Sequence, residues 1–194
     1  MPIRVDMELS QRQLWHLPNL LTGARVAAIP LLVLLLSFSG PVVSGVAAVC
    51  FLLAGATDFL DGFLARRRQL VSRWGRFMDP LADKLLVSAA LIMLIPLDRV
   101  PAWMAFIIIG RELAVTGLRA LAAAEGIILD PDRWGKAKTF LQMAALFALI
   151  LHYPYYGLDF HWAGLMLLWL ALITTVASGV GYFLTFFRQY PEGD

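Results

Sequence analysis

The stretch TDFLDGFLARRRQLVSRWGRFMDPLADK, residues 57–84, decides how the rest of the sequence is interpreted. It places Asp58 and Asp61 three residues apart and Asp79 and Asp83 four residues apart. At either spacing two side chains share one face of a helix. Apolar segments flank the stretch on both sides, so we expect the two pairs near the facing ends of consecutive helices joined by a short loop. The sequence therefore predicts two acidic helix faces that meet.

The composition of the chain indicates a membrane protein. Of its 194 residues, 60% are hydrophobic and 15% are charged, and the mean hydropathy of +0.73 is above that of soluble domains. The formal charge of +2 provides no broad basic field, so we predict that nucleic acid is not a partner. A single cysteine, Cys50, excludes an intrachain disulfide and a cysteine-based zinc cluster.

Turn signals divide the chain into six apolar segments. The signals are Gly40-Pro41 and residues 96–101, 126–132 and 153–161. Each segment has roughly the 20 residues that a helix needs to cross a bilayer. We therefore predict an all-α integral membrane fold with six transmembrane helices. Their expected bounds are Leu20–Phe38, Val42–Ala65, Pro80–Leu97, Ala102–Ala124, Trp134–Leu151 and Trp162–Phe187.

The distribution of basic residues predicts the orientation of these helices. With a cytoplasmic N-terminus, six spans leave Arg99 as the one basic residue on the outer side. We expect both termini and the acidic stretch to be cytoplasmic. Residues 1–16 lack the apolar core of a signal peptide, and we expect a short interfacial helix or a polar tail there. Residues 17–190 are expected to form one membrane domain. The predicted cytoplasmic cluster is Arg66, Arg67, Arg68, Arg73 and Arg76.

The four carboxylates of the acidic stretch suggest a metal site, because ionisable groups in membrane helices usually mark function. Unpartnered, they would repel one another, and divalent cations that prefer oxygen ligands remove that repulsion. Two such ions can stabilise displacement at phosphorus. The alternative is that the aspartates form helix-end salt bridges. Their partners would then be Arg66, Arg73, Arg76 and Lys84.

Polar residues recur on single faces of other predicted helices, and Asn19 and Thr22 could equally serve as a helix N-cap and a helix-packing hydroxyl. Asn19, Thr22 and Arg25 recur every three residues, and a charge within an apolar run indicates that this face lines a polar cavity. Arg111 and Arg119 are eight residues apart and so share a helix face.

Several of these basic side chains could bind an anionic group. Glu112, beside Arg111, is placed to orient one of the arginines. The alternative role is ordinary anchoring at the cytoplasmic membrane surface. The basic residues to which these two alternatives apply are Arg111, Arg119, Lys136 and Lys138.

Residues 58–83 also match a spaced pattern, D-x2-D-G-x2-A-R-x8-G-x3-D-x3-D. This pattern resembles the signature of the CDP-alcohol phosphotransferases, integral membrane enzymes of phospholipid synthesis. The resemblance implies a six-helix membrane fold, a homodimer, and a two-metal site at the cytoplasmic interface that binds a CDP-linked donor. The specified positions are Asp58, Asp61, Gly62, Ala65, Arg66, Gly75, Asp79 and Asp83.

Three further segments are similar to the bacterial phosphatidylglycerophosphate synthases within that family. They are Leu17–Pro30, Gly110–Gly126 and Trp134–Ala145, whereas residues 146–194 look generic. This similarity implies CDP-diacylglycerol as donor, sn-glycerol 3-phosphate as acceptor and a bacterial inner membrane as location.

The resemblance also implies roles for individual residues. Asp58, Asp61, Asp79 and Asp83 would bind two Mg²⁺ or Mn²⁺ ions, and Asp83 would also act as general base. The donor contacts would be Asn19, Thr22, Gly62, Ala65, Arg66 and Gly75. The acceptor phosphate would be bound by Arg25, Arg111, Arg119, Lys136 and Lys138.

Three other functions remain open from the sequence. An enzyme of the same family could use serine, inositol phosphate or phosphatidylglycerol as acceptor. A membrane prenyltransferase also uses aspartate pairs with magnesium, although the glycine, alanine and arginine within the pattern favour a CDP-linked donor. A small cation transporter would line its path with carboxylates.

Overall fold

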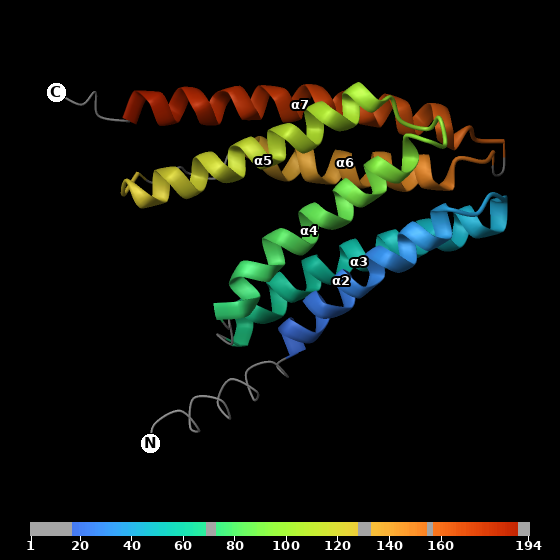
Figure 1. The fold of residues 1–194 in the computed structure, drawn as a ribbon, viewed down its shortest axis with the longest axis horizontal. Helices are drawn as coiled ribbons and strands as arrows, with labels where there is room; N and C mark the ends of the chain where they lie inside the picture. Colours follow the sequence, from blue (N-terminus) through green and yellow to red (C-terminus); the bar gives the residue numbers. More distant parts are fainter. Residues whose placement is uncertain (1–16, 69–72, 128–132, 155–156, 190–194) are drawn as a thin grey trace, which may run out of the picture. The chain divides into compact units, whose positions relative to one another are not determined.

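The structure is a computed structural model that describes the backbone of residues 17–68, 73–127, 133–154 and 157–189. Side chains are described for residues 23–56, 81–127, 137–154 and 157–189. Within these ranges every regular element is an α-helix (Figure 1). The predicted interfacial segment, residues 1–16, lies outside the described residues. The helices are α2 (Leu17–Leu36), α3 (Pro41–Arg68), α4 (Arg73–Leu94), α5 (Ala102–Ala124), α6 (Arg133–Leu151) and α7 (Phe160–Gln189).

Each of the six predicted apolar segments corresponds to one of these helices, which confirms the all-α class. The bounds of α5 agree to the residue. The largest difference is at α4, which begins at Arg73 rather than at Pro80. Its first turns place Arg73, Arg76 and Asp79 among apolar residues, so a continuous apolar run begins too late to mark the start. Gly75 and Asp79 therefore lie within the helix and not in the loop before it.

The chain forms two compact units, residues 1–90 and 91–194. In the first unit, α2 packs along α3, as Figure 1 shows. Ala47 and Ala48 of α3 are fully buried, and such small side chains allow close approach of helix backbones. Gly40, with φ of 138°, ends the connection before α3, and Pro41 suits the first helical position because its φ is fixed there.

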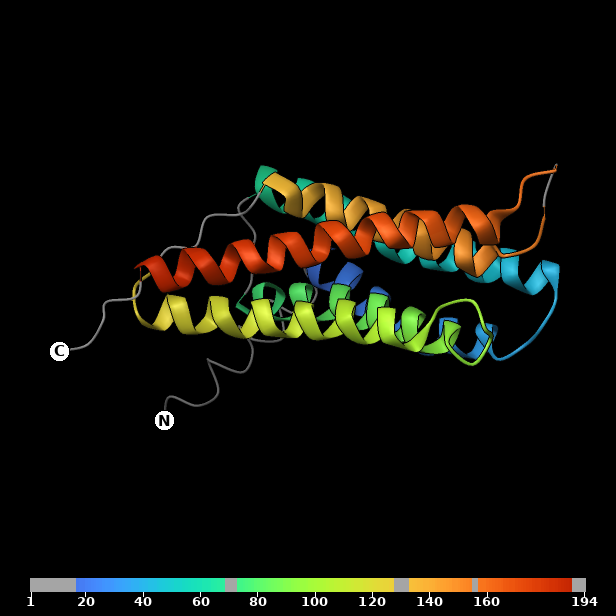
Figure 2. The ribbon, with the colours of Figure 1, turned by 90° about the horizontal axis from the view of Figure 1, so that it is seen from above.

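In the second unit, α7 packs against both α5 and α6 (Figure 2). A Cβ atom on Gly164 of α7 would lie 2.7 Å from Cγ of Leu149 on α6. Glycine at this position therefore lets α6 and α7 approach more closely than any other residue would.

The end of α5 is fixed by a Schellman motif. Gly126 has φ of 70°, and Ile127 N donates to Ala122 O at 2.8 Å while Gly126 N donates to Ala123 O at 3.3 Å. Ile127 also packs on the cluster of Leu118, Ala122 and Phe186. These bonds and this apolar contact are the usual way to satisfy the last carbonyls of a helix, and they confirm the break predicted at Gly126.

Among the described residues, α7 is the one helix long and apolar enough to cross a membrane by length and composition. Its most apolar window has a mean hydropathy of 2.0. Three shorter apolar stretches lie in α2, α3 and α6. They are Gly23–Leu36, Pro41–Ala56 and Ala137–Leu151.

Candidate active site

The acidic pairs both lie on helical backbone. Asp58 and Asp61 are in the C-terminal half of α3, and Asp79 and Asp83 are in the N-terminal half of α4. Helical spacing of three and four residues puts each pair on one face. Asp83 is partly buried. Several predicted site residues have side chains outside those described, namely Asn19, Thr22, Asp58, Asp61, Gly62, Ala65, Arg66, Gly75, Asp79 and Lys136.

The chemistry of the acidic pairs fits a divalent metal. Four carboxylates supply the hard oxygen ligands that Mg²⁺ and Mn²⁺ prefer. Among the described side chains, no group of three or more His, Cys, Asp or Glu residues is placed to hold a metal ion. Asp83 is the single predicted ligand whose side chain is described, so the metal site stays a prediction.

Arg25 ties α2 to α3 close to the first aspartate. Its side chain is 1% exposed, and its Nε donates a hydrogen bond to Ala54 O at 3.1 Å. Ala54 lies one helical turn before Asp58. This contact supports the prediction that the charged face of α2 turns away from lipid, because the guanidinium group is bonded within the protein.

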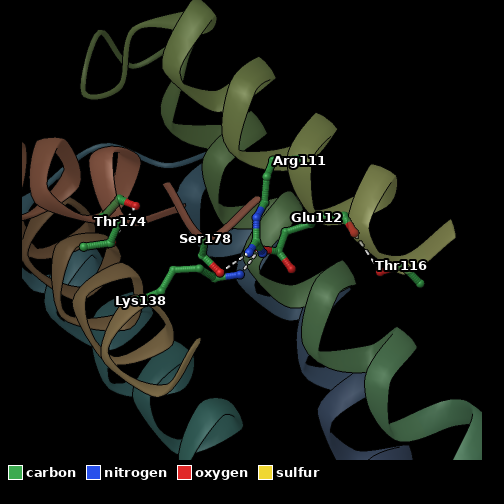
Figure 3. A network of polar contacts seen from close by, with 7 residues as sticks. Arg111, Glu112, Thr116, Lys138, Thr174 and Ser178 are labelled. Atoms are coloured by element: carbon green, nitrogen blue, oxygen red, sulfur yellow. Dashed lines mark hydrogen bonds and ion pairs between the residues drawn. The ribbon is translucent and has the colours of Figure 1, made fainter. Parts of the chain in front are cut away.

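A network of charged and polar side chains joins the three helices of the second unit (Figure 3). Arg111 Nη1 on α5 donates to Oε1 of its neighbour Glu112 at 3.0 Å. Arg111 Nη2 donates to Ser178 Oγ on α7 at 2.8 Å. Lys138 Nζ on α6 forms an ion pair with the same Oε1 of Glu112. One carboxylate therefore bridges two cations from different helices.

This network is largely shielded from solvent. The side chains of Arg111, Glu112 and Lys138 are 11%, 21% and 8% exposed. Two positive groups and one negative group leave one net positive charge, and shielding strengthens the attraction between that charge and an anion. Guanidinium and ammonium groups are also the side chains that bind phosphate most strongly. The network is therefore suited to bind a phosphorylated ligand.

Three buried polar atoms around the network add hydrogen-bonding capacity. Arg111 Nε, Gln142 Nε2 and Thr175 Oγ1 have no hydrogen-bond partner within the described part of the chain. Gln142 follows Lys138 by one turn of α6, and Thr175 precedes Ser178 by about one turn of α7. Buried polar groups are normally bonded, so these atoms can bond to water or to a ligand.

The structure brings together some of the predicted basic residues and not others. Arg111 and Lys138 are joined through Glu112, which orients Arg111 as expected. Arg119 is exposed about two turns further along α5 and is not a member of the network. Ser178 was not predicted from the sequence, because α7 is apolar and lies outside the segments that resemble the family. Serine next to glycine within an apolar helix was the available signal.

A second polar cluster lies at the other end of α6. Arg99 Nη1 donates to Ile150 O at 2.8 Å and to Leu149 O at 3.4 Å. A buried arginine thus satisfies the last carbonyls of α6, and burial lowers its pKa. His152 Nδ1 lies 3.2 Å from Nδ1 of His161. These contacts join the end of α6 to the start of α7.

The pKa of His152 is lowered from its ordinary value of 6.5. Burial is the largest cause, because it disfavours the charged imidazolium. The positive charges of Arg99 and His161 lower the pKa further, while Asp159 opposes the shift.

Comparison with known proteins places this chain in a family. Residues 15–177 match the profile of the CDP-alcohol phosphatidyltransferase family. The chain is 45% identical over 183 residues to the CDP-diacylglycerol--glycerol-3-phosphate 3-phosphatidyltransferase of Bacillus subtilis, a match that covers 88% of this chain and 94% of the relative. It is 40% identical over 169 residues to the protein of the same name in Rickettsia typhi, covering 87% and 95% of the two chains.

A third relative is the probable phosphatidylglycerophosphate synthase of Mycobacterium tuberculosis (strain CDC 1551 / Oshkosh). It is 39% identical over 171 residues, which cover 86% of this chain and 79% of the relative. The family profile spans α2 to α6 and most of α7. The chain belongs to the CDP-alcohol phosphotransferase family, as the signature in residues 58–83 predicted.

Proposed function

We propose that this chain transfers the phosphatidyl group of CDP-diacylglycerol to sn-glycerol 3-phosphate, giving phosphatidylglycerophosphate and CMP. The names of the relatives support this reaction, since the matches extend over most of each chain. The observation that carries the proposal is the shielded network of Arg111, Glu112 and Lys138. Its net positive charge suits an acceptor that brings its own phosphate, which serine does not.

The donor site is assigned to α2, α3 and α4. Asp58, Asp61, Asp79 and Asp83 would hold two Mg²⁺ or Mn²⁺ ions, which when bound stabilise negative charge on the phosphate oxygens. Gly62, Ala65 and Gly75 would leave room for the nucleotide, and Asn19 and Thr22 would contact it. The helical placement of both aspartate pairs supports this assignment.

The reaction needs one proton transfer and one displacement. Asp83 accepts the proton from the primary hydroxyl of the acceptor, whose oxygen attacks the phosphorus bonded to diacylglycerol. The bond between that phosphorus and the CMP oxygen breaks as the new bond forms. Arg66 stabilises the charge that develops on the leaving CMP.

The acceptor phosphate is assigned to basic residues of α2, α5 and α6. Arg111 and Lys138 bind it directly, since their charges already lie within one network. The shielded site reduces competition from water, which strengthens each charge-assisted hydrogen bond. The other proposed contributors are Arg25, Arg119 and Lys136.

The membrane arrangement is part of the same proposal. Residues 17–190 form one domain of six transmembrane helices in a bacterial inner membrane, with both termini and the active site cytoplasmic and residues 1–16 at the interface. Large apolar side chains on the surface support contact with lipid, since Val42, Phe106 and Phe140 are 77%, 78% and 74% exposed. The protein is proposed to be a homodimer by its family resemblance.

The test is release of CMP by detergent-purified protein supplied with CDP-diacylglycerol and Mg²⁺ or Mn²⁺. The acceptors compared are sn-glycerol 3-phosphate, inositol phosphate, serine, phosphatidylglycerol and none, with a chelator as control. We expect chelator-sensitive release that requires sn-glycerol 3-phosphate and yields phosphatidylglycerophosphate.

Other results would contradict specific parts of the proposal. Release of CMP with a different acceptor would support the proposed type of reaction but show that sn-glycerol 3-phosphate is not the acceptor. Folded protein that releases no CMP with any acceptor would overturn the proposed reaction. Turnover of a prenyl diphosphate would favour a membrane prenyltransferase, and metal flux without nucleotide would favour a cation transporter.

A further inference from the structure

We propose that Ser178 and Gly179 of α7 are positioning residues for the acceptor site, acting through Arg111. They hold the guanidinium group in the orientation in which it binds the acceptor phosphate. This inference rests on the proposed function, and it assigns a role to α7, which the sequence signals left without one. The two residues act on different parts of the same side chain.

Ser178 fixes the end of the Arg111 side chain. Its Oγ accepts a hydrogen bond from Arg111 Nη2 at 2.8 Å, and Ser178 is only 3% exposed. A hydrogen bond with a charged donor is stronger than a neutral one, and burial limits competition from water. Since Nη1 is already bonded to Glu112, the bond to Ser178 fixes the plane of the guanidinium group.

Gly179 provides the space for the shaft of the same side chain. A Cβ atom at position 179 would lie 3.1 Å from Cγ and 3.3 Å from Nε of Arg111. Both distances are shorter than ordinary van der Waals contact between such atoms, so a side chain larger than hydrogen would require Arg111 to shift by a few tenths of an ångström. Gly179 is itself buried in α7, which leaves the backbone little freedom to move away.

The orientation matters because Arg111 has donors left for a ligand. A guanidinium group carries five N–H donors in a rigid fork. Two nitrogen atoms use one donor each for Glu112 and Ser178, and Nε has no partner among the described residues. Ser178 and Gly179 therefore determine where the remaining donors point. A small rotation of the fork would weaken phosphate binding without removing the positive charge.

The test compares Ser178→Ala and Gly179→Ala with two controls on the same helix. Thr174→Val removes a hydroxyl that bonds to Leu170 O and Ala171 O of its own helix. Gly181→Ala adds a methyl group where no atom lies within 4 Å. Both variants of the positioning residues should raise KM for sn-glycerol 3-phosphate by about three- to tenfold, the range expected when one charged hydrogen bond is weakened. KM for CDP-diacylglycerol should stay at the wild-type value in these variants. The two control variants should keep wild-type KM values for both substrates.

A double-mutant cycle separates positioning from a general structural effect. Binding of sn-glycerol 3-phosphate is measured by calorimetry for Arg111→Ala, Ser178→Ala and the double variant, so turnover is not required. If Ser178 acts through Arg111, its substitution has no further effect once Arg111 is removed. The same cycle with Gly179→Ala should give the same result.

Three results would overturn the inference. They are an unchanged KM for sn-glycerol 3-phosphate in both variants, equal changes in both KM values, and additive effects in the cycle. Failure of the proposed function is distinguishable, because wild-type protein would then neither bind nor require sn-glycerol 3-phosphate. Thermal unfolding of each variant identifies loss of fold. A variant that unfolds is replaced by Ser178→Cys, in which the side chain has a similar size but is a weaker hydrogen-bond acceptor for Arg111.

Discussion

The acidic stretch of the first unit and the basic network of the second unit are built in different ways. The four aspartates lie within residues 58–83, at spacings fixed along two consecutive helices. The network of Arg111, Glu112, Lys138 and Ser178 draws on three helices and spans residues 111–178. The first can be identified from local spacing, whereas the second exists only because α5, α6 and α7 pack together.

The two regions also differ in the charge that must be compensated. The acidic stretch carries like charges, which bound metal ions would compensate under the proposed function. The basic network already contains a carboxylate that pairs with both of its cations. We infer that the first region carries out the chemistry and that the second determines which acceptor is used. Substitutions in the two regions should therefore affect different kinetic constants.

The largest effect is expected from Asp83→Asn, which removes the proposed general base. We expect kcat to fall by at least about 100-fold, the usual contribution of a positioned base. Binding of labelled CDP-diacylglycerol should be retained. The assay is CMP release at a saturating concentration of the acceptor substrate. Binding of labelled CDP-diacylglycerol is measured separately.

Asp98→Asn is the matched control for this substitution. Asp98 is exposed and has φ of 55°, a backbone conformation that asparagine accepts readily. Its kcat should equal that of wild type. Near-normal turnover in Asp83→Asn would exclude the residue from the base role.

Lys138→Gln should alter acceptor affinity and leave the donor unaffected. The change removes a charge that pairs with Glu112, so we expect KM for sn-glycerol 3-phosphate to rise about tenfold or more. Steady-state kinetics with each substrate varied in turn gives the comparison. Arg188→Gln, at an exposed arginine in the last turn of α7, should behave like wild type. Equal KM for the acceptor in both variants would remove Lys138 from the acceptor site.

Gly164→Ala should lower stability rather than alter either site. The added Cβ would lie 2.7 Å from Leu149 Cγ and 3.0 Å from Leu149 N, so α6 and α7 must separate slightly. Overpacking of this kind costs about 1–3 kcal/mol. Thermal unfolding should show a lower midpoint than in Gly117→Ala, where the new methyl group meets no atom within 4 Å. An unchanged midpoint would mean that α6 and α7 accommodate the added methyl group without loss of stability.

The smallest effect concerns pH and His152. Because the pKa of His152 is lower in the folded protein, the unfolded chain takes up the proton at a higher pH. The contribution to stability is therefore complete above about pH 6.5 and is lost as pH falls through the folded pKa. Screening by solvent keeps the effect small.

Unfolding of wild type and His152→Gln between pH 8 and pH 5 measures this contribution. The stability difference between the two proteins should change below pH 6.5, while KM for sn-glycerol 3-phosphate is the same in both at pH 8. A parallel pH dependence in the two proteins would assign the titration to another group.

Much of the fold could be predicted because apolar runs and turn residues carry the information locally. Gly40-Pro41 marks the start of α3 and Gly126 follows the end of α5. The start of α4 could not be predicted, since charged residues interrupt its first turns and Pro80 resembles a first helical position. The structure shows Pro80 well inside the helix.

The candidate site divides in the same way. The aspartates, Arg111, Lys138 and the orienting role of Glu112 were accessible from spacing, charge and family resemblance. Ser178 and Gly179 were not, because a serine or glycine in an apolar helix usually serves the helix itself. Their importance depends on Arg111 lying against them, which only the packing of α5 on α7 reveals.

The most direct measurement is the dependence of CMP release on the concentration of sn-glycerol 3-phosphate in wild type, Asp83→Asn and Lys138→Gln. The division of roles predicts that release in wild type requires the acceptor and saturates. Asp83→Asn should lower the plateau, and Lys138→Gln should raise the half-saturating concentration. CMP release that does not depend on the acceptor, or the same kinetic change in both variants, would contradict it.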